Sequence, residues 1–155
     1  MPKLPEQPKE SLVYEDEKLY ICLASKPFAF GHTVVVWKKD IEDLHLLSCE
    51  DYDYLMDVTD ALRDALLRTF KVKKVYMLYM DELKHVHWHL IPRFKVQGFK
   101  LFLHPNRTSK QPIGFPLVEK IKENFLLVLT KHPELGSRKT PFASRKHTTH
   151  QKGDP

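Results

Sequence analysis

Three histidines alternate with apolar residues in one short segment, His85-Val86-His87-Trp88-His89-Leu90-Ile91. In an extended strand successive side chains point to opposite faces, so the three imidazoles would share one face and the apolar residues the other. Val and Trp both suit a strand, and Pro92 would end it because proline lacks the backbone N–H that a sheet needs. A helix would instead scatter the imidazoles by about 200° per step. The segment therefore predicts a β-strand with its histidines on one face.

Three neighbouring imidazoles have three chemical interpretations. With a bound water they can form a catalytic zinc site, or one ring can act as a nucleophile while its neighbours hold a substrate. They can also be polar residues on the solvent face of a half-buried strand. A straight strand spreads the three positions along about 13 Å, so one metal ion would bind two rings more easily than three. We therefore favour the nucleophile and predict no metal site.

Composition limits the class of protein. A chain of 155 residues is long enough for one domain, and its 42% hydrophobic content argues against disorder of the whole chain. The formal charge of +5 favours anionic partners such as nucleotides or nucleic acid. The two cysteines, Cys22 and Cys49, form no CxxC pair, which argues against a disulfide framework and a cysteine zinc site.

The two ends of the chain differ from its middle. Residues 1–10 are rich in proline and charge and lack the apolar core of a signal peptide. No apolar run is long enough to cross a bilayer, so we expect a cytoplasmic protein with no membrane partner. Apolar periodicity stops after Thr130, and residues 131–155 carry six Lys or Arg against two acidic residues, a formal charge of +4. We expect flexible ends around a domain spanning residues 11–130; the basic tail is only a weak indication of nucleic-acid binding.

Short runs of β-branched and aromatic residues predict further strands, at residues 12–15, 18–24, 33–37 and 74–80. The turn Asp16-Glu17 separates the first two. Residues 74–80 are apolar on both faces, which predicts a central strand that is covered on two sides. In the long segment 93–114, residues 99–103 would pair briefly as a strand.

Two helices are predicted. The first would begin after Ser48, an N-cap residue with Asp51 three residues later. Its apolar stripe at helical spacing is Leu55, Val58, Leu62, Ala65 and Leu66. The second would begin at Pro116, a favoured first-turn residue. Its apolar face is Leu117, Ile121, Phe125 and Leu129. Together the elements predict an α+β domain with a mainly antiparallel sheet, one long helix across it and a C-terminal helix.

The histidine segment resembles a known family signature. It matches the histidine-triad (HIT) pattern, histidine-φ-histidine-φ-histidine-φ-φ with φ apolar, at every position. The Pro92-Arg93 that follows resembles the branch containing dinucleoside polyphosphate hydrolases. Residues 26–36 are similar to the family's segment that ends in Pro-Gly-His before an apolar strand, with Gly31-His32 at that place. The order of elements agrees, so the resemblance covers about residues 12–95 and implies a HIT-like domain.

This resemblance implies an activity. The implied protein is a homodimer whose sheets join, with a site on each subunit for a purine nucleotide or dinucleoside polyphosphate. The reaction is attack on the α-phosphorus of a nucleotide, giving a nucleotidyl-histidine that water hydrolyses. By position, His87 would be the nucleophile, and His89 would contact the α-phosphate and help to protonate the leaving group. His85 would support both rings through hydrogen bonds.

Other matched positions are implied substrate contacts. His32 would lie against the phosphate-side cluster, and Lys26 and Arg93 would bind the substrate. Many relatives have Asn or Asp at the position of Ala24, where it holds the ribose hydroxyls; alanine cannot, so this sugar contact would be absent or supplied elsewhere. The loop Asp81-Glu82-Leu83-Lys84 lacks the Gln or Ser that relatives use on the phosphate, and its carboxylates would repel a phosphate if they pointed inward.

The implied chemistry is physically reasonable. An imidazole with a pKa of about 6.5 is largely neutral at physiological pH, so it can attack without a separate strong base. The phosphoramidate that forms can be cleaved once its nitrogen is protonated, which divides a difficult displacement into two easier ones. The attack needs no metal cofactor, although magnesium can accompany a polyphosphate leaving group.

Three alternatives to the nucleotide hydrolase or nucleotidyltransferase stay open, the first being a zinc-dependent hydrolase that uses His85, His87 and His89. A nucleotide-binding or protein-interaction module with little turnover is favoured by Ala24 and the acidic loop. Removal of adenylate from nucleic-acid ends, as in aprataxin, would suit the basic tail. However, aprataxin carries a zinc finger after its triad domain, and this chain has no cysteine beyond Cys49.

Overall fold

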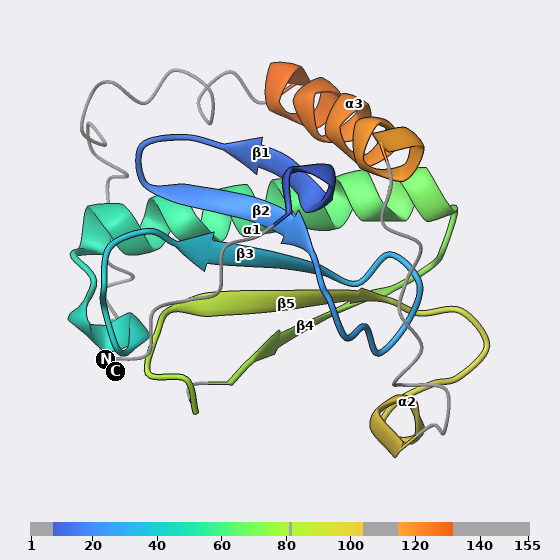
Figure 1. The fold of residues 1–155 in the computed structure, drawn as a ribbon, viewed down its shortest axis with the longest axis horizontal. Coiled ribbons are helices and arrows are strands. Elements are labelled where there is room, and N and C mark those ends of the chain that lie inside the picture. The colour runs from blue at the N-terminus through green and yellow to red at the C-terminus, as the bar shows by residue number, and fades with distance from the viewer. Residues whose placement is uncertain (1–7, 81, 104–114, 132–155) are drawn as a thin grey trace, which may run out of the picture.

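A five-stranded antiparallel sheet with two long helices makes up the computed structural model, which describes residues 8–80, 82–103 and 115–131 (Figure 1). The strands are β1 Leu12–Glu15, β2 Leu19–Leu23, β3 Thr33–Trp37, β4 Val75–Tyr79 and β5 His87–Pro92. They lie in the order β1-β2-β3-β5-β4, and every neighbouring pair is antiparallel. The predicted α+β class is confirmed. The expectations for residues 1–7 and 132–155 lie outside the described residues.

The structure has five helices in its described residues, and the two long ones begin close to where the sequence places them. They are the short η1 Lys9–Ser11, η2 Leu44–Leu46 and α2 Lys100–Leu103, and the long α1 Cys49–Phe70 and α3 Phe115–Lys131. Ser48 caps α1, because its hydroxyl accepts a hydrogen bond from the Asp51 backbone N–H at 3.1 Å. Lys71 ends α1 in the left-handed conformation, at φ 51°. Over the described residues, no helix is both long and apolar enough to span a membrane.

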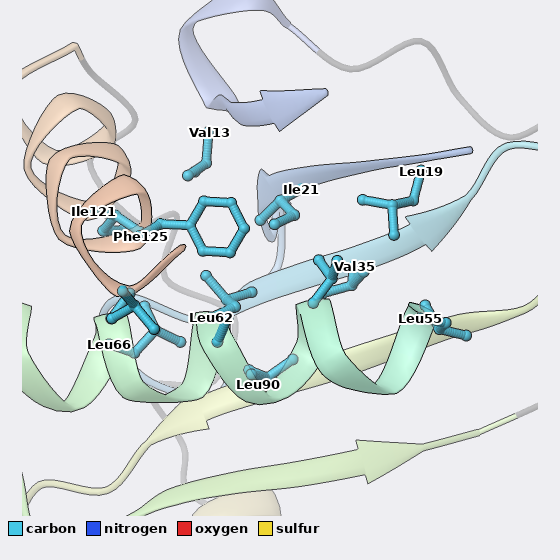
Figure 2. Packing of buried hydrophobic residues seen from close by; sticks show 14 of the residues in the cluster. Val13, Leu19, Ile21, Val35, Leu55, Leu62, Leu66, Leu90, Ile121 and Phe125 are labelled. Carbon is cyan, nitrogen blue, oxygen red and sulfur yellow. The ribbon is translucent and has the colours of Figure 1, made fainter. Parts of the chain in front are cut away.

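One core joins α1 and α3 to the sheet (Figure 2). The strands contribute side chains that are at most 1% exposed, among them Val13, Leu19, Ile21, Val35 and Leu90. The whole predicted stripe of α1 is buried against them. On α3, Ile121 and Phe125 are fully buried as predicted. The rest of its buried face is Val118 and Val128, because Leu117 and Leu129 lie at the margin of the contact.

Two predictions about local structure are wrong. The strand β4 lies at the edge of the sheet, not at its centre. It is apolar on both faces, but all five of its side chains are only partly buried, since it has a neighbour on one side alone. Residues 100–103 form helix α2 instead of a strand. Gly98, at φ 60°, turns the chain, and its carbonyl accepts a hydrogen bond from the Leu101 N–H at 3.1 Å.

Candidate active site

A cleft of about 300 Å³ opens on the face of the sheet away from the core. Its floor is formed by alternate residues of three adjacent strands: Tyr20 and Cys22 of β2, Val34 and Val36 of β3, His87 and His89 of β5. The register of the sheet explains this grouping. His89 pairs with Val34 and Val34 with Cys22, so their side chains share one face. The intervening residues of the same strands, such as Ile21 and Val35, enter the core.

The first histidine of the predicted row does not join the other two in the cleft. The strand begins at His87, and Lys84 before it has φ 49°, so His85 lies outside the regular strand. The His85 Nε2–H donates to the Trp37 carbonyl at 2.6 Å, and Nδ1 lies 3.6 Å from the Asp40 carboxylate. His85 therefore fixes the start of β5 to the end of β3.

The hydrogen bonding of His87 determines which of its nitrogens can react. Its Nδ1 lies 2.6 Å from the His85 carbonyl oxygen. A carbonyl only accepts, so Nδ1 carries the proton, and in the neutral ring Nε2 holds the lone pair. The ring is 6% exposed and lines the cleft. In its neutral form, His87 thus presents the Nε2 lone pair at a nearly buried position.

A chain of hydrogen bonds sets the proton positions of the other two rings. The Phe28 backbone N–H donates to His32 Nδ1 at 3.1 Å, so the neutral His32 ring carries its proton on Nε2. That Nε2 lies 2.9 Å from His89 Nδ1, which must therefore accept. The proton of a neutral His89 then sits on its Nε2. In their neutral forms, His87 therefore offers the Nε2 lone pair to the cleft, and its neighbour His89 offers an Nε2–H.

Burial keeps His32 and His89 neutral. Desolvation, followed by the nearby His89, lowers the pKa of His32 to about 3. Desolvation, followed by His87, lowers the pKa of His89 to about 4, and the Glu82 carboxylate opposes this by raising it. Both rings are therefore uncharged at neutral pH, and the tautomers that their hydrogen bonds require are the ones present.

The floor of the cleft is uncharged, and its rim is not. Burial raises the pKa of the Cys22 thiol and of the Tyr20 phenol, each to about 12, so both stay protonated. Lys26 and Glu82 are exposed residues that line the cleft, one of each charge. The cleft can therefore take a ligand with an apolar part on the floor and a charged part beside the histidines.

Most residues predicted for the site come together in this cleft. Besides the two strand histidines, His32, Lys26 and Ala24 line it. Arg93 lies elsewhere, at the end of β5, where its backbone N–H donates to the Lys74 carbonyl at 3.0 Å. It is not among the residues that line the cleft, and its contact with a substrate stays a prediction.

Some contributors to the site were missed at the sequence level. Tyr20, Cys22 and Val34 lie on predicted strands, but only the pairing of β2 and β3 with the histidine strand shows that they face the cleft. Phe28 acts through its backbone N–H and stacks its ring on His32, with centroids 5.6 Å apart. A backbone donor leaves no signal in the sequence.

The described residues also bear on the zinc interpretation. Among residues 8–80, 82–103 and 115–131, no group of three or more His, Cys, Asp or Glu side chains could hold a metal ion. The hydrogen bonds of the histidines are consistent with this, because Nδ1 of His87 and of His89 and both nitrogens of His32 are already engaged.

Comparison with known proteins agrees with the fold and the triad. The HIT domain family model matches residues 5–96. An uncharacterized HIT-like protein of Borreliella burgdorferi is 30% identical over 119 residues, 72% of this chain and 81% of the relative. A solved hypothetical histidine triad nucleotide-binding protein of Sulfolobus tokodaii has a TM-score of 0.63 at 23% identity, covering 84% of this chain and 91% of its own. The diadenosine triphosphate hydrolase of Plasmodium falciparum, solved with cyclomarin A, has a TM-score of 0.51 at 17% identity, covering 84% and 82%. The chain therefore belongs to the HIT domain family.

Proposed function

We propose that this protein is a nucleotide hydrolase or nucleotidyltransferase that attacks the α-phosphorus of its substrate with His87 Nε2. The observation that carries the proposal is the bond between the His87 Nδ1–H and the His85 carbonyl, which puts the lone pair of the neutral ring on Nε2, in the cleft. As the Nε2–P bond forms, the bond from phosphorus to the leaving group breaks, and its electron pair goes with the leaving group. A nucleotide remains joined to His87.

His89 supports this step through its Nε2–H, which can donate to a phosphoryl oxygen as negative charge develops there. Because the His89 ring is neutral and its Nδ1 accepts from His32, it has no second proton to give, so the leaving group takes its proton from solvent water and not from His89 as the family resemblance implies. In the second step water attacks the phosphorus, its proton passes to solvent, and the N–P bond to His87 breaks with its electrons returning to Nε2.

The shape of the cleft suits one nucleoside. A volume of about 300 Å³ is at the small end for ligand pockets. The uncharged floor at Tyr20, Cys22 and Val34 fits a purine, and the phosphate would lie against the histidines near Lys26. The second half of a dinucleoside polyphosphate would extend past the rim. The attack itself needs no metal, and magnesium would serve to neutralise a polyphosphate leaving group.

Membership of the family leads us to propose a homodimer as well. The strand β4 ends the sheet, and its five apolar or aromatic side chains are all partly exposed. A long apolar edge strand is normally covered, because its free backbone groups would otherwise recruit other chains. A second copy pairing along β4 would cover it and join the two sheets. Sedimentation equilibrium tests this, and a monomer at micromolar concentration would contradict it.

The covalent intermediate can be trapped directly. Brief exposure to an adenylated substrate, followed by acid-free quenching and intact-mass measurement, should show a mass increase of one adenylate. Peptide mapping should place it on His87. His87→Ala should lose both the adduct and turnover, while nucleotide affinity stays within an order of magnitude. His45→Ala is the matched control, since that side chain is 74% exposed. Turnover of His87→Ala within tenfold of wild type would refute the covalent mechanism.

A second function is favoured by two residues of the cleft. Glu82 places a carboxylate beside the phosphate position, and Ala24 offers no side-chain partner for ribose. A nucleotide-binding or protein-interaction module with little turnover would tolerate both. In that case calorimetry would show nucleoside monophosphate binding, while the mass measurement would show no adduct and no product would accumulate.

A further inference from the structure

One end of the sheet gathers aromatic side chains from three separate segments. The loop between β2 and β3, the end of α1 and the chain leaving β5 all lie at this end (Figure 1). Phe70 contacts Phe30 on one side and Phe94 on the other, with ring centroids 5.5 Å and 5.9 Å apart. Phe30 is 45% exposed and Phe94 42% exposed. Each ring thus keeps part of its surface open to solvent while Phe70 supports it.

Basic residues are close in sequence to Phe70 and Phe94. They are Arg68, Lys71, Lys73, Lys74, Arg93 and Lys95, and together with the rings they are called here the basic aromatic surface. Lys71 follows Phe70 directly, and Arg93 and Lys95 flank Phe94. The hydrogen bond from the Arg93 N–H to the Lys74 carbonyl, at 3.0 Å, holds the two basic segments side by side. The cations and the rings therefore occupy the same end of the molecule.

The sequence around these basic residues lacks acidic residues. Neither residues 65–80 nor residues 92–103 contain an Asp or Glu. Within the described part of the chain, none of the six basic residues of this surface forms an ion pair. The negative end of the α1 dipole accounts for Arg68 and Lys71, but its effect does not extend beyond the last turn. Lys73, Lys74 and Lys95 are exposed cations that the fold itself does not require.

We propose that the basic aromatic surface binds single-stranded nucleic acid. Single-strand sites combine cations that follow the phosphates with aromatic rings on which bases stack. Phe30 and Phe94 offer two partly open rings in contact with Phe70, and Lys71 and Lys95 directly follow Phe70 and Phe94 in the sequence. A duplex keeps its bases stacked on one another, so it would use the cations alone. This binding does not depend on the proposed reaction, because Lys73, Lys74 and Lys95 are not among the residues that line the cleft.

The charge contribution is tested with full-length protein and a fluorescein-labelled 20-nucleotide single strand, by anisotropy over a range of salt concentrations. Lys73→Ser/Lys74→Ser/Lys95→Ser should weaken binding at least tenfold at low salt. It should also reduce the slope of log K against log salt by about 2, since each phosphate contact contributes about 0.7. The control Lys9→Ser/Lys120→Ser/Lys131→Ser removes the same charge from exposed positions elsewhere and should change the affinity less than twofold. Equal effects of the two triple variants would overturn the proposal.

The stacking contribution has its own test. Phe94→Ala should weaken single-strand binding roughly 5- to 150-fold, the range for loss of one stacked base, and leave the salt slope unchanged. Its effect on a hairpin duplex should be small. Unchanged single-strand affinity, with circular dichroism showing a folded variant, would overturn the stacking claim.

An anionic membrane is the competing partner, since Phe99 on the neighbouring segment is 87% exposed. Measuring binding to phosphatidylglycerol vesicles as well as to the oligonucleotide distinguishes a membrane from a nucleic acid as the partner. Lysine-dependent binding to the vesicles with no binding to the oligonucleotide would overturn the proposal, and the reverse pattern would support it.

Discussion

His32 should make the stability of the fold depend on pH. The residue is 1% exposed, and its burial, together with the nearby His89, lowers its pKa to about 3. In the unfolded chain the ring titrates near its ordinary pKa of about 6.5. Between pH 6.5 and about pH 3, the His32 ring therefore binds a proton in the unfolded state but not in the folded state. The contribution of His32 to stability is therefore complete above pH 6.5 and is lost as the pH falls toward 3.

The expected magnitude follows from these two pKa values. A difference of one bound proton changes the free energy of unfolding by about 1.4 kcal/mol per pH unit. Between pH 7 and pH 4.5, His32 should thus remove about 3 kcal/mol from the stability of the protein. A small domain has a total stability of only about 5–15 kcal/mol, so the loss should be readily measurable. The lowered pKa of His89 acts in the same direction.

The variant His32→Gln isolates this effect, because an amide can accept from the Phe28 N–H and donate to His89 but does not titrate. Urea unfolding at pH 7 and pH 4.5 should show that wild type loses about 3 kcal/mol more than the variant over this range. The control His45→Gln changes an exposed histidine and should keep the pH dependence of wild type. The same pH dependence in wild type and His32→Gln would refute the reasoning.

Three further substitutions test other parts of the site. Gly31→Ala should lower the free energy of unfolding by about 2–4 kcal/mol in urea denaturation, because Gly31 has φ 80° and an added Cβ would overlap the Phe70 ring. A decrease of less than about 1 kcal/mol would contradict this close approach of Gly31 to Phe70. Glu82→Gln should raise kcat/KM for a dinucleoside polyphosphate by about 3- to 10-fold, since it removes a charge that repels a polyanionic leaving group. An equal gain for a nucleoside phosphoramidate would argue against charge as the cause. Ala24→Asn should tighten nucleoside monophosphate binding about two- to tenfold in calorimetry through one added hydrogen bond. Its effect on a 2′,3′-dideoxy nucleotide should be smaller, and equal effects would show that the residue does not face the sugar.

Local patterns were sufficient to predict most of the fold. The strands β1 and β3 have the predicted bounds, because β-branched and aromatic runs bounded by turns are local signals. The N-cap and stripe of α1 are equally local. The position of β4 in the sheet is not a local property. A strand with apolar residues on both faces is expected at the centre of a sheet, yet it can equally lie at an edge.

The site could be predicted in part for the same reason. The two-residue period correctly places His87 and His89 on one face, because the period is a property of the strand itself. It fails for His85, where the left-handed Lys84 and the bond to the Trp37 carbonyl decide the position of the ring. The Lys84 conformation and the bond to Trp37 both depend on the pairing of β5 with β3. The residues next to His85 in the sequence therefore do not predict them.

The loop between β2 and β3 connects the cleft to the basic aromatic surface. Its start and end are tied together, since the Ala24 N–H donates to the His32 carbonyl at 2.9 Å. Within it, Phe28 holds His32 through its backbone while Phe30 turns the other way onto Phe70. Gly31 lies between the two, at the one position in this loop with positive φ, where an added Cβ would overlap the Phe70 ring. A base stacked on Phe30 would therefore restrain the segment that orients His32. Through the bond between His32 and His89 it would also restrain the His89 Nε2–H, which we propose faces the phosphate.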